Sequence, residues 1–298
     1  MNVSASQTPR APVRGHPRRL ALVLLGAGLT SILILLPLVA VFYYALREGW
    51  SVYFGHLKDS ETLHAIYLTL LAALVSVPVN TVFGIVAAWT IAKFSFPGRR
   101  LLTSLIELPL SISPIVIGIA YLFVFGGQGL FGEWLADHEE ALTFFGHELR
   151  LVFSVPAIVI VTTIVTMPFV FREVLPLMQS QGTSEELAAI SLGAGGWKTF
   201  WRVTLPNIKW ALIYGISLTF ARSLGEFGSV AIVSGAIRNE TNTMTLQIHM
   251  LFDDRTQTGA FAVASILTSI ALVTLLVKTW VERREAQRLA EGVKMQAK

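Results

Sequence analysis

The chain contains no cysteine and few charged residues. Without cysteine it can form neither a disulfide nor a thiolate metal site, and it has no cysteine nucleophile. Charged residues make up only 14% of the 298 residues, whereas about a quarter is usual in soluble domains. Hydrophobic residues reach 53%. So few charges cannot cover a water-exposed surface, and the composition predicts one membrane domain, surrounded by a lipid bilayer, that uses nearly the whole chain.

Catalytic motifs are also missing. The segment around Lys198 and Thr199 lacks the glycine that directly precedes the lysine of a phosphate-binding Walker A loop. Neither of the two His-Glu dipeptides, which begin at His138 and His147, extends to the His-Glu-x-x-His pattern of a zinc site. No paired serine and histidine stands out either. We therefore expect no enzyme activity, no bound cofactor and no metal on this chain.

Six apolar runs are comparable in length to the roughly 20 residues that a membrane-spanning helix needs. They cover residues 20–46, 63–94, 101–125, 151–170, 210–234 and 259–281. The first run is longer than the apolar core of a cleavable signal peptide, so we expect it to remain as a helix. The predicted fold class is all-α, a polytopic membrane protein with six transmembrane helices.

Lysine and arginine are concentrated on one side of these spans. That side holds a tail at 1–19, the turn after the second span, the segment 172–209 and a second tail at 282–298. The loops of the opposite side contain few basic residues, and one of them is acidic. The positive-inside rule therefore predicts that both termini are cytoplasmic. This segregation explains the net charge of +4 without nucleic acid as a partner.

The segment 181–206, between the fourth and fifth spans, has the pattern of two short helices lying across the cytoplasmic face. Thr183 or Ser184 can cap the first helix, and Gly193 is expected to end it. The second helix is expected to stop before Pro206. Exposed alanines and a glycine hinge would allow another protein to approach closely. The alternative is an interfacial amphipathic helix without a partner.

This segment resembles the EAA loop of ABC-importer permeases. The positions that match the family pattern are Ala188, Ala189, Gly193, Leu205 and Pro206. Leu187 stands where the family has glutamate, and Glu186 directly precedes it. The resemblance implies that these residues, with Glu186, form a coupling loop that docks into a cytoplasmic ABC ATPase dimer. That partner, and not this chain, would bind ATP and magnesium.

The resemblance extends over residues 62–281 and implies the type I, MetI-like permease fold, preceded by a first helix and loop at 20–61. Segments at 167–173, 205–212, 221–228 and 233–238 resemble the CysW-type permeases of the sulfate/thiosulfate subgroup. Asn239, Thr245 and His249 depart from that subgroup's pattern.

Import of sulfate or thiosulfate across the inner membrane, by alternating access, is the activity that this resemblance implies. The implied partners are a homologous second permease in a heterodimer and an extracytoplasmic sulfate-binding protein. Residue chemistry leaves molybdate and tungstate open as substrates. A channel or an ATP-independent secondary transporter is the alternative from another class.

Polar residues inside the predicted spans are candidates for the translocation pathway. Ser111 and Ser113 lie beside Pro114 in the third span, where two prolines five residues apart remove helical hydrogen bonds. Their hydroxyls could meet a passing oxyanion, although a kinked helix explains the pattern equally well. Arg222 and Glu226 are four residues apart and can pair with each other, with or without contacting substrate.

Small residues recur at every fourth position of the fifth span. They are Ser217, Ala221, Gly225 and Ser229. Such a row allows two helices to approach closely in a membrane. We expect the fifth span to pack along this row against the partner permease or the lining of the pore.

Overall fold

The computed structural model describes residues 17–138, 143–144, 147–148 and 150–296, and most of these are helical. Two strands of two residues each, β1 (Thr143–Phe144) and β2 (His147–Glu148), form an antiparallel pair. The all-α prediction is therefore confirmed for the described residues, apart from this short hairpin.

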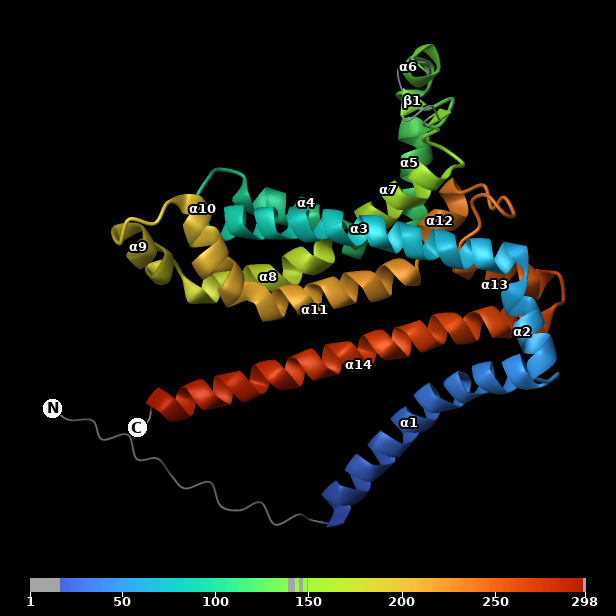
Figure 1. Cartoon of the computed structure of the whole chain (residues 1–298), viewed down its shortest axis with the longest axis horizontal. Coiled ribbons are helices and arrows are strands. Elements are labelled where there is room, and N and C mark those ends of the chain that lie inside the picture. Colours follow the sequence, from blue (N-terminus) through green and yellow to red (C-terminus); the bar gives the residue numbers. More distant parts are fainter. Residues whose placement is uncertain (1–16, 139–142, 145–146, 149, 297–298) are drawn as a thin grey trace.

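Long helices run alongside one another in the main body of the molecule (Figure 1). They are α3 (Ser60–Lys93), α8 (Pro168–Gln181), α11 (Leu205–Leu224) and α14 (Gln257–Gln296). α7 (Val155–Thr166) leads into α8. α1 (Pro17–Leu46) contacts α14 near one end and diverges from it toward the N-terminus.

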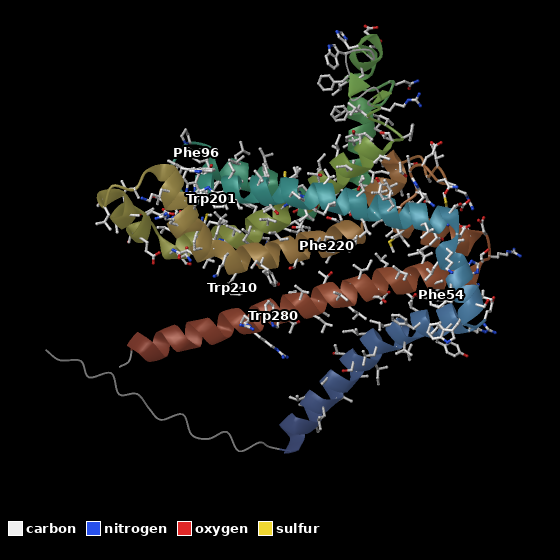
Figure 2. All side chains as sticks on the ribbon, viewed as in Figure 1. Phe54, Phe96, Trp201, Trp210, Phe220 and Trp280 are labelled. Carbon is white, nitrogen blue, oxygen red and sulfur yellow. The ribbon has the colours of Figure 1, made fainter. Side chains whose placement is uncertain are left out.

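Shorter elements close the two ends of this body. At one end lie α9 (Ser184–Ser191), α10 (Gly196–Thr199) and the π-helical turn η2 (Phe200–Thr204). At the other end lie α2 (Trp50–Lys58) and α13 (Met244–Asp253). Aromatic side chains occur at both ends, with Phe54 on α2 and Phe96 and Trp201 near α10 (Figure 2). Such rings favour the headgroup layer of a bilayer.

Four helical segments are long and apolar enough to cross a membrane. They are Ala21–Leu46, Ser60–Lys93, Val155–Gln181 and Gln257–Trp280. α4 (Arg99–Ser111) and α5 (Pro114–Phe125) make a fifth if they are counted as one span. α11 is long enough but is not among these apolar segments. The number of six transmembrane helices therefore remains a prediction.

The predicted third span, 101–125, is broken into two helices at the irregular backbone that its prolines predict. α4 and α5 are bent by 111° at Ile112 and Ser113, which have extended backbone. The physical reason is Pro114, because a residue that precedes proline is disfavoured in the helical region. α5, followed by α6 (Gly132–Asp137) and the β-hairpin, consequently projects away from the long helices (Figure 1).

The expected span at 210–234 is wrong in its boundaries. α11 begins earlier, at Leu205, and ends at Leu224. A short turn separates it from α12 (Gly228–Val233), which packs against α5 and α7. The chain thus changes direction near Gly225 instead of continuing as one helix.

The tightest packing joins α3, α8 and α11. A Cβ atom added to Gly84 would lie 2.8 Å from Val170 Cβ, and one added to Gly215 would lie 3.0 Å from Val170 Cα. Phe171 and Ile208 are fully buried beside this contact. By contrast, the membrane-length part of α1 buries almost nothing against the rest of the chain. α3, α8 and α11 therefore form the packed core, and α1 is peripheral.

Candidate functional site: the coupling loop and the polar interior

The first helix of the coupling loop ends at Gly193, as predicted. Gly193 adopts a left-handed conformation with φ of +85°. Its N–H donates to the carbonyl of Ile190 at 2.9 Å, and the N–H of Ala194 donates to that of Ala189 at 3.0 Å. These two bonds define a Schellman turn, which favours glycine at the left-handed position. At the start of α9, Thr183 makes no side-chain cap, so the expected capping there is not observed.

Glu186 points into the molecule and fastens the loop to its neighbours. Its carboxylate lies 2.8 Å from the Lys93 ammonium group, and it accepts a hydrogen bond of 2.7 Å from the Thr204 hydroxyl. Both side chains of the ion pair are largely buried. Lys93 also donates to the carbonyl of Gly182, and Asn207 donates to Glu185. Glu186 therefore joins α9 to the end of α3 and to η2, and Glu185 joins it to the start of α11.

The expected stop before Pro206 is wrong. α10, η2 and α11 form one helical stretch from Gly196 to Leu224. Pro206 lies in the first turn of α11, directly after the π-helical turn. A proline in a helix removes one backbone donor, and here the wider turn before it accommodates the change. The coupling loop is consequently continuous with the helix that carries Arg222.

Large apolar side chains of the loop face outward. Leu192 is 90% exposed and Trp197 is 75% exposed, and Leu187 and Ile190 are more than half exposed. Ala188 is also exposed, and Ala189 is half-buried. This surface, which we call the apolar face of the loop (Leu187, Ile190, Leu192 and Trp197), lies at the end of the long helices (Figure 1). Exposed apolar patches of this kind mark interaction sites.

The serines of the broken third span lie at the bend. Ser111 is the last residue of α4, and Ser113 directly precedes Pro114 at the start of α5. Both serines are exposed. The irregular backbone that the prolines predicted is therefore present at this position.

Arg222 and Glu226 form the predicted ion pair, at 2.9 Å. Glu226 is buried, with 1% of its side chain exposed, whereas 34% of the Arg222 side chain is exposed. Glu226 also accepts bonds from the N–H of Ser229 at 3.1 Å and from its hydroxyl at 2.9 Å. The glutamate thus fixes the turn between α11 and α12 and leaves the guanidinium group partly open.

The row of small residues does not form one helical groove. Ser217 and Ala221 lie on α11, Gly225 ends that helix, and Ser229 belongs to α12. A Cβ atom at Gly225 would meet nothing closer than 3.8 Å. Close contact occurs instead between Ser229 and Gly118, whose added Cβ would lie 2.9 Å from the Ser229 carbonyl. Interruption of the helix at Gly225 divides the row between α11 and α12, and packing of the row against a partner permease stays a prediction.

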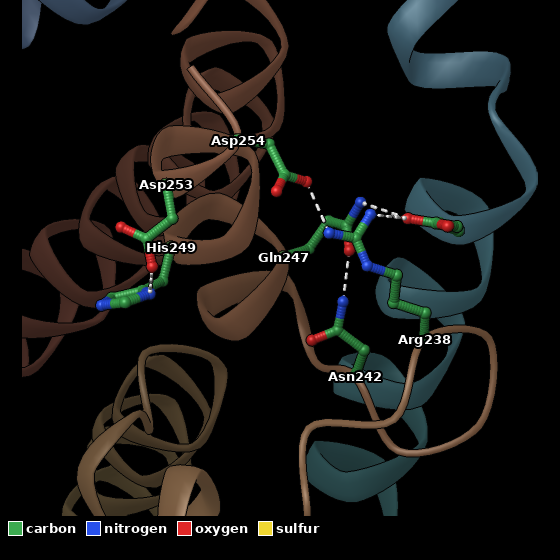
Figure 3. A network of polar contacts seen from close by, with 7 residues as sticks. Arg238, Asn242, Gln247, His249, Asp253 and Asp254 are labelled. Atoms are coloured by element: carbon green, nitrogen blue, oxygen red, sulfur yellow. Dashed lines mark hydrogen bonds and ion pairs between the residues drawn. The ribbon is translucent and has the colours of Figure 1, made fainter. Parts of the chain in front are cut away.

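A polar network at the opposite end was not predicted (Figure 3). Arg238 pairs with Glu61 of α3 at 3.1 Å and with Asp254 after α13. The hydrogen bond that Arg238 donates to the Asp254 carboxylate raises the pKa of Arg238 above its ordinary value, so the guanidinium group stays charged. Gln247 contacts Glu61 and accepts a bond from Asn242. These partners lie far apart in sequence, so no local pattern could reveal them.

Two of the positions that depart from the sulfate subgroup lie near this network. The Thr245 hydroxyl donates to the carbonyl of Glu226 at 2.8 Å, and His249 lies 3.0 Å from Asp253 on the exposed surface (Figure 3). Among the described residues, no three His, Cys, Asp or Glu side chains are grouped as metal ligands.

The sequence of most of the chain matches a known protein family. Residues 80–287 fit the model of the binding-protein-dependent transport system inner membrane component. The chain belongs to this family. Within it, the chain is 46% identical to the sulfate transport system permease protein CysW of Escherichia coli K12, over 88% of this chain and 87% of that protein.

Other relatives agree with this assignment. The chain is 42% identical to the CysW protein of Synechocystis over 87% of this chain and 91% of that protein. It is 33% identical to the CysT permease of Escherichia coli K12, over 87% of this chain and 90% of that protein. A crystal structure of a bacterial ABC transporter involved in alginate import has a TM-score of 0.69 at 17% identity, covering 90% of this chain and 94% of that chain. This likeness shows the fold of an ABC-importer permease. The binding-protein-dependent transport component described here is thus a multi-pass membrane protein.

Proposed function

We propose that the chain is a permease subunit of a sulfate ABC importer in the inner membrane. The observation that carries the proposal is the 46% identity to a sulfate permease over 88% of the chain. The chain does not hydrolyse ATP in this proposal. A separate ATPase dimer binds ATP and magnesium, and this subunit converts its movement into alternating access.

The apolar face of the coupling loop supports docking of that ATPase. Four large apolar side chains point outward at an end of the molecule that also carries Lys93, Arg99 and Arg100, and basic residues mark the cytoplasmic side. Glu186 and Lys93 hold the base of the loop rigidly. A force applied to the loop is therefore passed to α3 and α11 instead of being lost in local bending.

Arg222 is the candidate contact for a passing oxyanion. Its guanidinium group is partly exposed, while the buried Glu226 balances its charge. A balanced pair attracts an anion only weakly, which suits a pathway where tight binding would block release. Ser111, Ser113 and Pro114 are candidates for the same pathway.

The proposed assembly contains a second permease and an extracytoplasmic binding protein. Relatives of this chain include both CysW and CysT permeases, which supports a heterodimer. A solved alginate importer with a similar fold, at a TM-score of 0.66, is in complex with a periplasmic protein. Both termini of this chain would be cytoplasmic in the assembly.

Uptake of radiolabelled sulfate tests the function. Cells that lack this chain are complemented with the native protein, with Arg222→Gln, or with Ser217→Ala as a control on the same helix. We expect the native chain and Ser217→Ala to restore uptake and Arg222→Gln to reduce it by tenfold or more. If the native chain restores uptake of molybdate or tungstate but not of sulfate, the substrate assignment is wrong.

A further inference from the structure

A polar cavity of 360 Å³ lies at the end of the molecule opposite the coupling loop, between α1, α2 and α14. Its lining includes Arg47, Arg255 and His56. Arg47 and Arg255 are more than 200 positions apart, and both come from the predicted extracytoplasmic loops, which contain few basic residues. The fold therefore gathers two of those scarce positive charges into one cavity.

Both guanidinium groups are available to a ligand. Within the described part of the chain, neither Arg47 nor Arg255 has a side-chain hydrogen bond or ion pair. Glu48 also lines the cavity, but its carboxylate accepts a hydrogen bond of 2.6 Å from the Thr258 hydroxyl. Arg238, on the same side of the molecule, is already paired with Glu61 and Asp254. Two arginines against one carboxylate leave the cavity positively charged.

Arg255 occupies a backbone position that favours glycine. Its φ is +62°, in the left-handed region. Its N–H donates to the carbonyl of Phe252 at 3.1 Å, and the N–H of Thr256 donates to that of Leu251 at 2.9 Å. This is the Schellman turn seen at Gly193, with arginine in the left-handed position. A long charged side chain at such a strained position points to a use for the side chain itself.

The walls of the cavity are held in place by contacts between elements. Tyr44 of α1 stacks on Phe261 of α14, with ring centroids 5.0 Å apart. A Cβ atom added to Gly259 would lie 3.1 Å from Nδ1 of His56, so α2 also packs closely on α14. The cavity is consequently a defined feature of the fold at this junction.

An apolar depression of 560 Å³ adjoins the cavity and shares Arg47 with it. Its other lining residues are Val39, Phe42, Tyr43 and Leu46. All four lie near the end of a membrane-length segment that finishes at Leu46, so Arg47 lies at the level of the headgroups. A charged cavity at headgroup level that continues into an apolar surface at acyl-chain level has the chemistry of a phospholipid site.

We propose that this junction binds an anionic phospholipid of the extracytoplasmic leaflet. Arg47 and Arg255 hold the phosphate through charge-assisted hydrogen bonds, and Thr256 adds a hydroxyl group. An acyl chain lies along Val39, Phe42 and Leu46 of α1. The lipid fills the junction where α1 leaves the rest of the molecule and so stabilises the position of this peripheral helix.

Native mass spectrometry of the detergent-solubilised transporter tests the proposal. The complex is titrated with dioleoylphosphatidylglycerol, dioleoylphosphatidylcholine or inorganic sulfate. The variants are Arg47→Gln, Arg255→Gly and their combination, with Lys58→Gln as a control that removes a basic residue of α2 outside the cavity. Arg255→Gly relieves the backbone strain, so a loss of lipid binding in this variant is not a loss of folding.

We expect the native complex to bind phosphatidylglycerol more tightly than phosphatidylcholine. The Lys58→Gln control should show the same preference. The double variant should bind phosphatidylglycerol about tenfold more weakly or worse. Equal binding of phosphatidylglycerol by the native complex and the double variant overturns the proposal. If the double variant loses binding of inorganic sulfate but still binds phosphatidylglycerol as the native complex does, the proposal is also overturned, and the cavity is a site for a free oxyanion. If the complex that carries Arg47→Gln loses the second permease, a protein and not a lipid covers the surface around Arg47, and the proposal is wrong.

Discussion

The two ends of the molecule distribute polar and apolar side chains in opposite ways. At the coupling loop, Glu186 turns inward to Lys93 while Leu192 and Trp197 face outward. At the other end, Arg238 is paired on the surface with Glu61 and Asp254. The difference supports the proposal that the coupling loop docks a protein partner, whereas the Arg238 network satisfies its own charges.

The same turn makes a second contrast between these ends. α9 ends with Gly193 in the left-handed position, and α13 ends with Arg255 in the corresponding position. Glycine minimises the backbone strain at the end of α9. Arg255 has a strained backbone at the corresponding position, and its side chain places a positive charge in the lining of the cavity. Substitutions at both ends therefore test whether this contrast is functional.

The largest effect is expected from Leu192→Asp, because it puts a charge at the centre of the apolar face of the loop. We expect sulfate uptake to fall more than tenfold while the protein still inserts into the membrane. The reason is that an unpaired charge buried at a protein interface costs roughly several kcal/mol of binding free energy. Leu130→Asp, at a position that is 84% exposed between α5 and α6, is the control. If the ATPase copurifies equally with both variants, the loop is not its docking surface.

Glu186→Gln should have the next largest effect. The variant keeps a group that can accept from Thr204 but loses the charge that pairs with Lys93 in a largely buried setting. We expect a loss of stability of about 2 kcal/mol, measured as thermal unfolding of the purified complex. The double variant Glu186→Gln with Lys93→Met should lose less than the sum of the two single changes. Additive losses would show that the ion pair is not coupled.

Gly193→Ala should cost about 1 kcal/mol, because a Cβ atom is disfavoured in the left-handed region. Nothing lies within 4 Å of the added atom, so the cost comes from the backbone alone. Gly196→Ala is the matched control, since that glycine also has open space around it but no left-handed φ. Identical unfolding temperatures for these two variants would contradict the strained turn.

Arg255→Gly should have the smallest effect on unfolding, and in the opposite direction. Relief of the left-handed strain should raise stability by less than about 1 kcal/mol, because glycine also loses more backbone entropy on folding. Thermal unfolding in detergent without added lipid measures this gain. A marked loss of stability would mean that the Arg255 side chain supports the fold directly.

The sequence predicted well those features that depend on neighbouring residues. The second apolar run, 63–94, nearly coincides with α3, and the helix end at Gly193 and the pair of Arg222 with Glu226 are both present. Each rests on hydropathy, glycine conformation or helical spacing within a few residues.

Features that depend on the path of the chain were beyond the sequence. The prolines indicated irregular backbone near Ser113. Hydropathy does not depend on the direction of the helix axis, so it could not predict a bend of 111°. The continuous helix through Pro206 depends on a π-helical turn that has no clear local pattern. Lys93 pairs with Glu186, and Arg47 and Arg255 line one cavity, only because distant elements pack together.

α11 (Leu205–Leu224) connects the end of the coupling loop to the turn beside Arg222. At about 1.5 Å per residue, its 20 residues measure roughly 30 Å. A straight helix of this length that tilts by about 5° about one end moves its other end by roughly 2 to 3 Å. That displacement is comparable to the width of one water molecule, so the proposed transmission from the coupling loop to the pathway requires no change within the helix itself.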